Sequence, residues 1–351
     1  MTAEIYGSDR MSDGRPGPEV SVIIVNWNGR ELLEECLRSL SAQTFRDFEV
    51  ILVDNGSSDG SAEWVEKNHP EAAVLRLKQN LGFSAGNNAG LKLARGRFIA
   101  LLNNDTKAEP GWLEALHRGI SADQQIAACD SMVLYYDRPD LIWSAGADYT
   151  VAGSVSARHH LQPAARMPEK EGSSSPADVF VAVACAAIYR KKVIEEIGLF
   201  DEDFFNGYED VDWSFRAHLF GHRIVNQPQA IVRHKVSSTQ VHNSPEFVYH
   251  GQRNVGAVFL KNMPGWLLFK YSWLHLAYSL GSLVYFARAG RLTSFLRAKR
   301  DLLGMLPGIL RKRKKIQAGR VLETAQVEAL LSQDWLHAKT RKFLGGDPSA
   351  G

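Results

Sequence analysis

The sequence predicts an α/β protein built on a mostly parallel sheet with helices on both faces. Two apolar stretches, residues 20–27 and 48–55, flank residues 31–40, in which apolar side chains recur at helical spacing. This strand-helix-strand order continues along the chain, and the strands are continuously apolar instead of alternating. Such strands are buried on both faces, which is typical of a parallel sheet between two layers of helices.

The remaining elements follow in order along the chain. In the first half we expect a short helix at 63–67, a strand at 73–77, a helix at 84–94 and a strand at 97–103. In the second half we expect a buried strand, or a strand and a turn, at 179–190, a helix ending at Gly198, a helix at 209–220 and a strand at 229–234. The sequence therefore predicts one domain over 19–260, preceded by a flexible tail (1–18) and followed by a helical, amphipathic and basic region (261–351).

Composition excludes several classes of protein. Hydrophobic residues make up 45% and charged residues 23% of the 351 positions, as in globular proteins, and the net charge of +2 gives no overall attraction to nucleic acid. The three cysteines lie far apart, so the chain shows neither a zinc motif nor a disulfide framework and fits a reducing cytoplasm. Residues 1–18 lack the apolar stretch of a secretory signal.

Polar clusters follow three predicted strands, at residues 26–29, 54–59 and 103–105. In open α/β sheets ligands bind at the carboxyl ends of the strands, so these clusters predict a ligand site at one edge. The alternative is that they only make turns, which is the commonest role of Asn, Asp, Ser and Gly. For residues 57–59 we favour that alternative, as a cap on the following helix.

A phosphate-binding ligand at this edge would need a neutralising group. The chain has no GxGxxG after its first strand and no GxxxxGK[ST] motif, so neither a dinucleotide fingerprint nor a P-loop is present. A Mg²⁺ or Mn²⁺ ion held by Asp105 would serve, because these ions bind carboxylate oxygen together with substrate phosphates.

The segment 201–221 concentrates acidic and aromatic residues. Glu209 and Asp210 begin a predicted helix, where the macrodipole favours negative charge, so helix capping alone explains them. The surrounding aromatic side chains also provide an environment that raises a carboxylate pKa toward that of a useful base. His234 stands alone at the end of an apolar run and is either structural or a ligand.

Taken together, six motifs resemble the inverting family 2 glycosyltransferases of GT-A fold, especially their bacterial rhamnosyltransferase-like branch. They occur in the order of the family and cover about residues 20–260. By this resemblance 19–120 is the nucleotide half and 121–260 the acceptor half. The motifs are VSVIIVNWNG (20–29), VDNGSSDGS (53–61), NLGFSAGNNAG (80–90), LLNND (101–105), FFNGYEDVDWSFR (204–216), and VRHKVSST with YHGQRN (232–254).

The resemblance implies a role for each matching residue of the donor site. Asp105 is the metal ligand in a variant of the DxD signature, His234 is a second ligand to metal or diphosphate, and the cofactor is Mg²⁺ or Mn²⁺. The family often carries two aspartates, where this chain has an Asn pair before Asp105. The implied contacts to the nucleotide sugar are Asn26, Asn28, Asp54, Asn80, Gly82, Phe83, Asn104 and Arg253.

The resemblance also implies the reaction. Asp210, with Glu209 beside it, matches the general base that takes the proton from an acceptor hydroxyl group while that oxygen attacks the anomeric carbon. The implied donor is a dTDP, UDP or GDP sugar, with dTDP-L-rhamnose the first expectation. The acceptor is a glycan or a polyprenyl-diphosphate-linked precursor of the cell envelope.

The C-terminal region suggests a membrane partner. Residues 266–290 are apolar and aromatic, and a basic run follows at 311–315. One interpretation is interfacial helices that bind an anionic membrane surface, which would place the protein in the cytoplasm, peripherally at the inner face of the cell membrane. The other is helices packed on the catalytic domain.

Two further classes remain open from the sequence. A sugar-1-phosphate nucleotidyltransferase shares the sheet type but carries a glycine-rich, basic loop after its first strand, which NWNGRELLEE does not match. A non-catalytic protein that binds nucleotide sugars or a membrane surface would keep its role when Asp210 is replaced.

Overall fold

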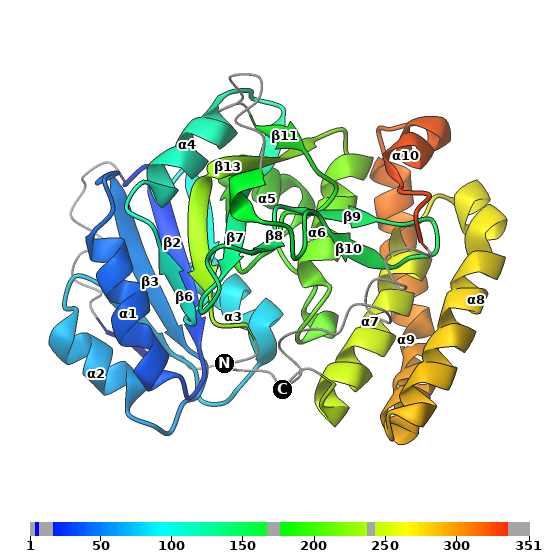
Figure 1. Ribbon diagram of the computed structural model, residues 1–351, viewed down its shortest axis with the longest axis horizontal. Helices are drawn as coiled ribbons and strands as arrows, with labels where there is room; N and C mark the ends of the chain where they lie inside the picture. Colours follow the sequence, from blue (N-terminus) through cyan, green and yellow to red (C-terminus); the bar gives the residue numbers. More distant parts are fainter. Residues whose placement is uncertain (1–3, 7–16, 167–175, 237–242, 336–351) are drawn as a thin grey trace.

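The computed structural model describes residues 4–6, 17–166, 176–236 and 243–335. Its strands are β1 (Glu4–Tyr6), β2 (Val20–Asn26), β3 (Phe48–Asp54), β4 (Ala73–Arg76), β5 (Phe98–Leu102), β6 (Thr106–Ala108), β7 (Ile126–Tyr135), β8 (Ile142–Ser144), β9 (Ala147–Tyr149), β10 (Val155–Ala157), β11 (Ala177–Asp178), β12 (Ala186–Arg190) and β13 (Arg223–His234). An 11-stranded sheet runs β1-β4-β3-β2-β5-β12-β7-β13-β11, with β6 on β13 and β8 on β7, and β9 pairs with β10 separately (Figure 1).

The predicted parallel sheet is confirmed for β4, β3, β2 and β5, which pair in parallel. β12 differs, because it runs antiparallel between β5 and β7. The predicted strand at 179–190 is also shorter than its apolar run, since β12 begins only at Ala186. The backbone N–H groups of Val183 and Ala184 bond to the carboxylates of Asp130 and Asp210 instead of to a neighbouring strand.

Helices cover both faces of the sheet. They are α1 (Arg30–Ser41), α2 (Ser61–Asn68), α3 (Gly82–Leu91), α4 (Trp112–Ser121), α5 (Lys191–Ile197), α6 (Glu209–Leu219), α7 (Pro245–Asn262), α8 (Gly265–Arg288), α9 (Leu292–Gly319) and α10 (Thr324–Leu330), with short 3₁₀ turns η2 (Ala164–Arg166) and η3 (Glu202–Phe204). α1, α2 and α4 share one apolar core with the sheet. α5 and α6 share the core on the opposite face, where α3 also packs, and a Cβ at Gly90 of α3 would lie 2.7 Å from Ile23. These two layers confirm the predicted fold class.

The C-terminal helices pack on the rest of the chain through a third core. Leu267 and Tyr271 of α8 and Leu302 of α9 share it with Phe215 of α6 and with Tyr149 of β9. In Figure 1, α8 is the outermost helix of this half. Among the described helices, none combines the length and the apolarity needed to span a membrane.

The basic run at 311–315 is divided between the surface and the interior. Lys312 forms ion pairs with Asp201 and Asp203, and Arg313 donates to the carbonyl oxygens of Leu260 and Met263. Arg311, Lys314 and Lys315 are exposed. The predicted basic surface is therefore smaller than the run suggests.

At the N-terminus, β1 pairs antiparallel with β4. The rest of the predicted tail, except residues 17 and 18, lies outside the described residues. The division into a tail, a domain of two halves and a C-terminal region stays a prediction.

Candidate functional site

The first part of the site is the edge of the sheet where β2, β3 and β5 end. Asn26 and Asp54 are register partners at the last positions of β2 and β3. Asn104, beyond the end of β5, donates from its side-chain amide to Asn26 Oδ1 over 2.7 Å, and both side chains are buried. Parallel strands place their carboxyl ends on one edge, which is why these predicted residues meet.

Asn28 shapes the turn after β2. Its φ angle is +50°, a conformation that Asn tolerates better than most residues. The Asn28 side-chain oxygen accepts from Ser58 N at 2.8 Å, and Asn28 N donates to Ser57 Oγ at 3.0 Å. Both serines therefore bind the neighbouring turn. The N-cap of α2 is Gly60, which has no side chain to cap the helix, and of the three predicted capping residues only Asp59 bonds to the start of α2, accepting from the N–H of Ser61.

Asp54 is the buried acid of this edge. Its Oδ1 atom has no hydrogen-bond partner among the described residues. Burial raises the pKa of Asp54 above its ordinary value, against the opposing effect of hydrogen bonds from Ser57. A buried oxygen without a donor is a position where a bound molecule can supply one.

Asn55, which the sequence analysis did not select, connects the Asp54 turn to the loop before α3. Its side chain donates to Asn80 Oδ1 over 3.1 Å and accepts from Leu81 N over 2.9 Å. Asn80 Oδ1 also accepts from Gly82 N at 2.8 Å. The predicted donor-site residues Asn80 and Gly82 are thus held beside Asp54 by amide groups.

Gly82 is where the first half of the chain meets the second. Its φ angle is +84°, and a Cβ there would lie 2.5 Å from the carbonyl oxygen of Phe205. That carbonyl accepts from Phe83 N at 2.7 Å, while the Phe83 ring stacks on Phe200. Only glycine fits here, because the left-handed backbone and the contact with Phe205 both exclude a side chain.

Asp105 and His234 form a buried pair at the same edge. Asp105 Oδ1 lies 3.1 Å from His234 Nε2, because β6 pairs with the end of β13 directly after Asp105. His234 Nδ1 is buried without a hydrogen-bond partner among the described residues. His234 is therefore not alone, and the two residues predicted as metal ligands lie together.

These two residues fit one divalent ion. Adjacent ligands of an octahedral ion lie about 3 Å apart when each bond is about 2.1 Å, close to the separation of Asp105 Oδ1 and His234 Nε2. The described residues contain no cluster of three or more His, Cys, Asp or Glu able to hold a metal. Mg²⁺ and Mn²⁺ commonly take one or two protein ligands and complete their coordination with substrate phosphate and water.

Glu209 and Asp210 begin α6, as predicted. Asp210 accepts backbone N–H bonds at both carboxylate oxygens, from Ala184 at 3.2 Å and from Val211 at 2.8 Å. Glu209 is buried and its Oε2 atom has no partner among the described residues. Burial raises the pKa of Asp210, while burial and then the Asp210 charge raise the pKa of Glu209 to about 8.

The loop at 183–185 links the two acidic parts of the site. Ala184 N bonds to Asp210, and the next carbonyl, that of Cys185, accepts from Asn103 N at 2.8 Å. Asp130 of β7 anchors this loop through Val183 N at 2.9 Å. We did not select Asp130 from the sequence, although an acidic residue inside the apolar stretch 126–135 was a visible signal.

Arg253 of α7 is bonded to the segment that precedes α6. Its guanidinium donates to the carbonyl oxygens of Asp203 and Phe204, at 2.8 and 2.9 Å. Arg253 thereby holds the loop that carries Phe205. Its predicted contact with the nucleotide sugar stays a prediction.

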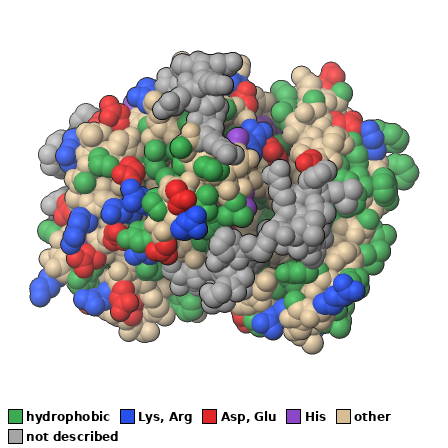
Figure 2. Space-filling model, in the orientation of Figure 1, with side chains coloured by type: hydrophobic (Ala, Val, Ile, Leu, Met, Phe, Trp, Pro, Cys, Tyr) green, Lys and Arg blue, Asp and Glu red, His purple; other side chains and the backbone are tan. Residues whose placement is uncertain are grey.

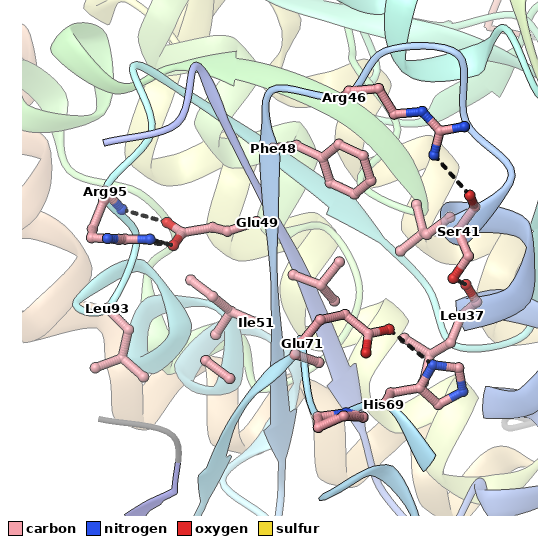
Figure 3. Close-up of a pocket in the computed structure, with 15 residues that line it drawn as sticks. Leu37, Ser41, Arg46, Phe48, Glu49, Ile51, His69, Glu71, Leu93 and Arg95 are labelled. Carbon is pink, nitrogen blue, oxygen red and sulfur yellow. Dashed lines mark hydrogen bonds and ion pairs between the residues drawn. The ribbon is translucent and has the colours of Figure 1, made fainter. Parts of the chain in front are cut away.

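A separate hollow of about 400 Å³ opens around the beginning of β3, at the end of that strand opposite to Asp54. Figure 3 shows Glu49 turned toward Arg95 and Glu71 toward His69 across it, at 2.8 and 3.3 Å. The acidic groups that line it are thus paired within the protein.

The comparison with protein families agrees with the fold and with the site. The family model for glycosyl transferase family 2 matches residues 21–198, just over half of the chain. The chain belongs to glycosyl transferase family 2. Membership decides against the nucleotidyltransferase alternative.

Similar proteins align with this chain over different shares of their length. Over 120 residues the chain is 33% identical to a cholesterol galactosyltransferase of Borreliella burgdorferi, which covers 34% of each chain. Over 264 residues it is 27% identical to the N-acetylglucosaminyl-diphospho-decaprenol L-rhamnosyltransferase of Mycobacterium tuberculosis, covering 67% of this chain and 85% of that one. The chain thus spans about a third of the length of the first relative.

A solved structure of a glycosyltransferase shares the fold. The mannosyltransferase PcManGT from Pyrobaculum calidifontis, in complex with GDP-Man and Mn²⁺, superposes with a TM-score of 0.52 at 18% identity. The match covers 95% of this chain and 91% of that one. The GT-A fold implied by the sequence motifs is confirmed.

Proposed function

We propose that this protein is a metal-dependent inverting glycosyltransferase that moves a sugar from a nucleoside diphosphate sugar to a hydroxyl group. Family membership and the GT-A fold support the reaction class. The similarity to the mycobacterial L-rhamnosyltransferase supports dTDP-L-rhamnose as the first donor to test, before UDP and GDP sugars.

Buried acidic residues at the sheet edge and at the start of α6 support this function most. Asp54 Oδ1 and Glu209 Oε2 lack hydrogen-bond donors among the described residues, and Asp105 lies against His234. In the proposed complex Asp54 reads the base, while Asn26, Asn28, Asn80, Gly82, Phe83 and Asn104 surround the nucleoside, and Arg253 closes on the donor.

In the proposed reaction Asp210 is the general base. The acceptor oxygen attacks the anomeric carbon, its proton passes to the Asp210 carboxylate, and the bond from that carbon to the diphosphate oxygen breaks. The two backbone N–H groups on Asp210 favour its ionised form, whereas Glu209 keeps its proton up to about pH 8. One displacement inverts the anomeric centre.

Asp105 and His234 would hold the divalent ion. When bound, Mg²⁺ or Mn²⁺ offsets the negative charge that develops on the departing diphosphate. The acceptor proton and the leaving group lie on opposite faces of the sugar in an in-line displacement. Separate acidic residues, one from each half of the chain, serve these two tasks.

Calorimetric titration of dTDP, UDP and GDP, with and without Mn²⁺ or Mg²⁺, tests the donor site. We expect one nucleotide to bind only with metal, and binding to disappear in Asp105→Ala and His234→Ala. Asp140→Ala, which removes an exposed carboxylate paired with Arg138 on the surface, is the control and should bind normally. Metal-independent binding that survives Asp105→Ala would contradict the proposed role of Asp105.

We also propose an acceptor that is a glycan or a polyprenyl-diphosphate-linked precursor of cell-envelope polysaccharide. The name of the mycobacterial relative, which includes a diphospho-decaprenol acceptor, supports this class. Such an acceptor would be met at a membrane, so we propose a peripheral location at the inner face of the cell membrane. Radiolabelled sugar transferred from the donor into an organic-soluble product tests it, and transfer only to water-soluble glycans would contradict the lipid-linked class.

A further inference from the structure

The outer side of α8 is an exposed apolar stripe. Six large hydrophobic side chains recur on it at helical spacing, and the three most exposed are Phe269 at 73%, Trp273 at 65% and Trp266 at 62%. No Asp, Glu, Lys or Arg occurs between residues 271 and 287. The stripe consists of Trp266, Phe269, Trp273, Leu276, Leu280 and Val284. Hydrophobic side chains gather along the corresponding right-hand edge in Figure 2.

The inner side of the same helix is also apolar, but it is packed. Leu267, Tyr271, Leu274 and Tyr278 are buried in the core shared with α6, α7 and α9, and Phe286 packs on Phe295 of α9. α8 is therefore fixed along its length to the protein, and only the stripe can meet a partner. A partner that covers the stripe must therefore contact α8 along its length and cannot surround it.

Exposed basic side chains lie at the end of α8 and along α9. Residues 263–320 contain twelve lysines and arginines and one acidic residue, Asp301, which is bonded to Tyr249 and Arg300. Arg288 ends α8, and Arg297, Arg311, Lys314 and Lys315 are exposed on α9. Leu296, Leu303 and Leu310 are exposed apolar residues of α9 as well.

We infer that α8 and α9 form a surface that binds an anionic lipid bilayer, with the α8 stripe inserted among the acyl chains at the interface. Tryptophan and phenylalanine favour the boundary between headgroups and acyl chains, and basic residues beside an apolar face attract anionic headgroups. A helix buried along one side can insert only its other side, so α8 lies in the plane of the interface. The inference does not depend on the proposed sugar transfer.

Vesicle flotation of the full-length protein without nucleotide tests this surface. The two vesicle types are phosphatidylcholine alone and phosphatidylcholine with roughly one third phosphatidylglycerol. We expect the triple variant Phe269→Gln, Trp273→Gln, Leu276→Gln to bind both types at least about tenfold less than the wild type. Replacing Arg311, Lys314 and Lys315 by Gln should reduce binding by about tenfold or more on the anionic vesicles only.

The control replaces exposed apolar residues outside the two helices, Val321→Gln with Leu330→Gln, and should leave vesicle binding unchanged. Equal binding of the wild type and the stripe variant, or an equal loss in the control, would overturn the inference. So would light scattering that shows a wild-type dimer, a monomeric stripe variant and no vesicle binding, since a second copy would then cover the stripe. Thermal unfolding checks that each variant is folded.

Discussion

At the donor edge amide groups satisfy one another, whereas at the start of α6 two carboxylates lie next to each other. Asn104 donates to Asn26 and Asn55 donates to Asn80, so amide contacts hold together the edge that carries Asp54 and Asp105. Glu209 and Asp210 instead share a desolvated environment in which their pKa values are raised. In the proposed reaction the first region recognises the donor, and the second moves a proton.

This contrast separates two kinds of mutational effect. Amide-to-amide contacts cost little electrostatic energy, and their loss should appear in folding and in nucleotide binding. Two adjacent buried acidic groups oppose each other's ionisation, and the loss of either should appear in rate and in pH dependence. The contrast would be wrong if variants at the sheet edge changed mainly the rate, or if variants at the start of α6 changed mainly nucleotide binding.

The largest expected effect is that of Asp210→Asn. Loss of a general base should lower the transfer rate by about 10²- to 10⁴-fold, with nucleotide affinity unchanged. Steady-state release of nucleoside diphosphate, measured beside calorimetry, separates the two quantities. Unimpaired transfer would remove Asp210 from the reaction and favour the non-catalytic alternative.

Gly82→Ala should damage the contact between the two halves. The positive φ and the clash with the Phe205 carbonyl together should cost about 3 kcal/mol of unfolding free energy. Gly60→Ala is the matched control, because its φ is +77° and nothing lies within 4 Å of the new Cβ. Urea unfolding should give only about 1 kcal/mol for the control, and equal losses would show that the clash is relieved.

Glu209→Gln should stabilise the protein in a pH-dependent way. The side chain ionises near 4.5 when unfolded and near 8 when folded, so between these values the folded state holds one extra proton and loses stability as pH rises. Glutamine cannot ionise. The variant should exceed the wild type by roughly 4 kcal/mol near pH 8 and match it near pH 4.5. A pH-independent difference in urea unfolding would mean that Glu209 is not the titrating group.

The smallest effect is expected from Asn104→Ala. It leaves Asn26 Oδ1 buried without its donor, which should cost about 1–2 kcal/mol of unfolding free energy and weaken nucleotide binding. Asn68→Ala, which removes an exposed amide bonded to Trp64 O, is the control and should change neither quantity much. If both variants lose the same free energy of unfolding, the contact between Asn104 and Asn26 does not stabilise this edge of the sheet.

Sequence patterns predicted β2 to β5 with the helices α1, α2 and α3, and the meeting of residues 26, 54 and 104, but not α4 or β7. Both follow from local rules, since apolar runs define strands and parallel strands bring their ends to one edge. The antiparallel insertion of β12 could not be predicted in this way, because it is a pairing with β5 and β7, which lie far from β12 in the sequence. The pairing of Asp105 with His234 is likewise a tertiary contact.

The basic run at 311–315 shows that helical spacing also decides which charged residues are exposed. Ile309 and Ile316 of α9 are buried, and residues 312 and 313 fall on the same side of the helix as these two. Lys312 and Arg313 therefore turn inward, to Asp201 and to Leu260 O. Helical periodicity therefore predicts which residues of a basic run face the protein and which face solvent.

Ion pairs of two lysines fix the C-terminal helices against the segment that leads into α6. Lys261 of α7 contacts Asp201 and Asp212, and Lys312 of α9 contacts Asp201 and Asp203, so both helices grip the segment around the start of α6. If the α8 stripe inserts into lipid, these ion pairs keep Asp210 at a constant distance from the bilayer. An acceptor hydroxyl at that distance would reach the base, whereas one held nearer or farther by a shorter or longer glycan would not. The proposed acceptor would then be selected by its length as well as by its chemistry.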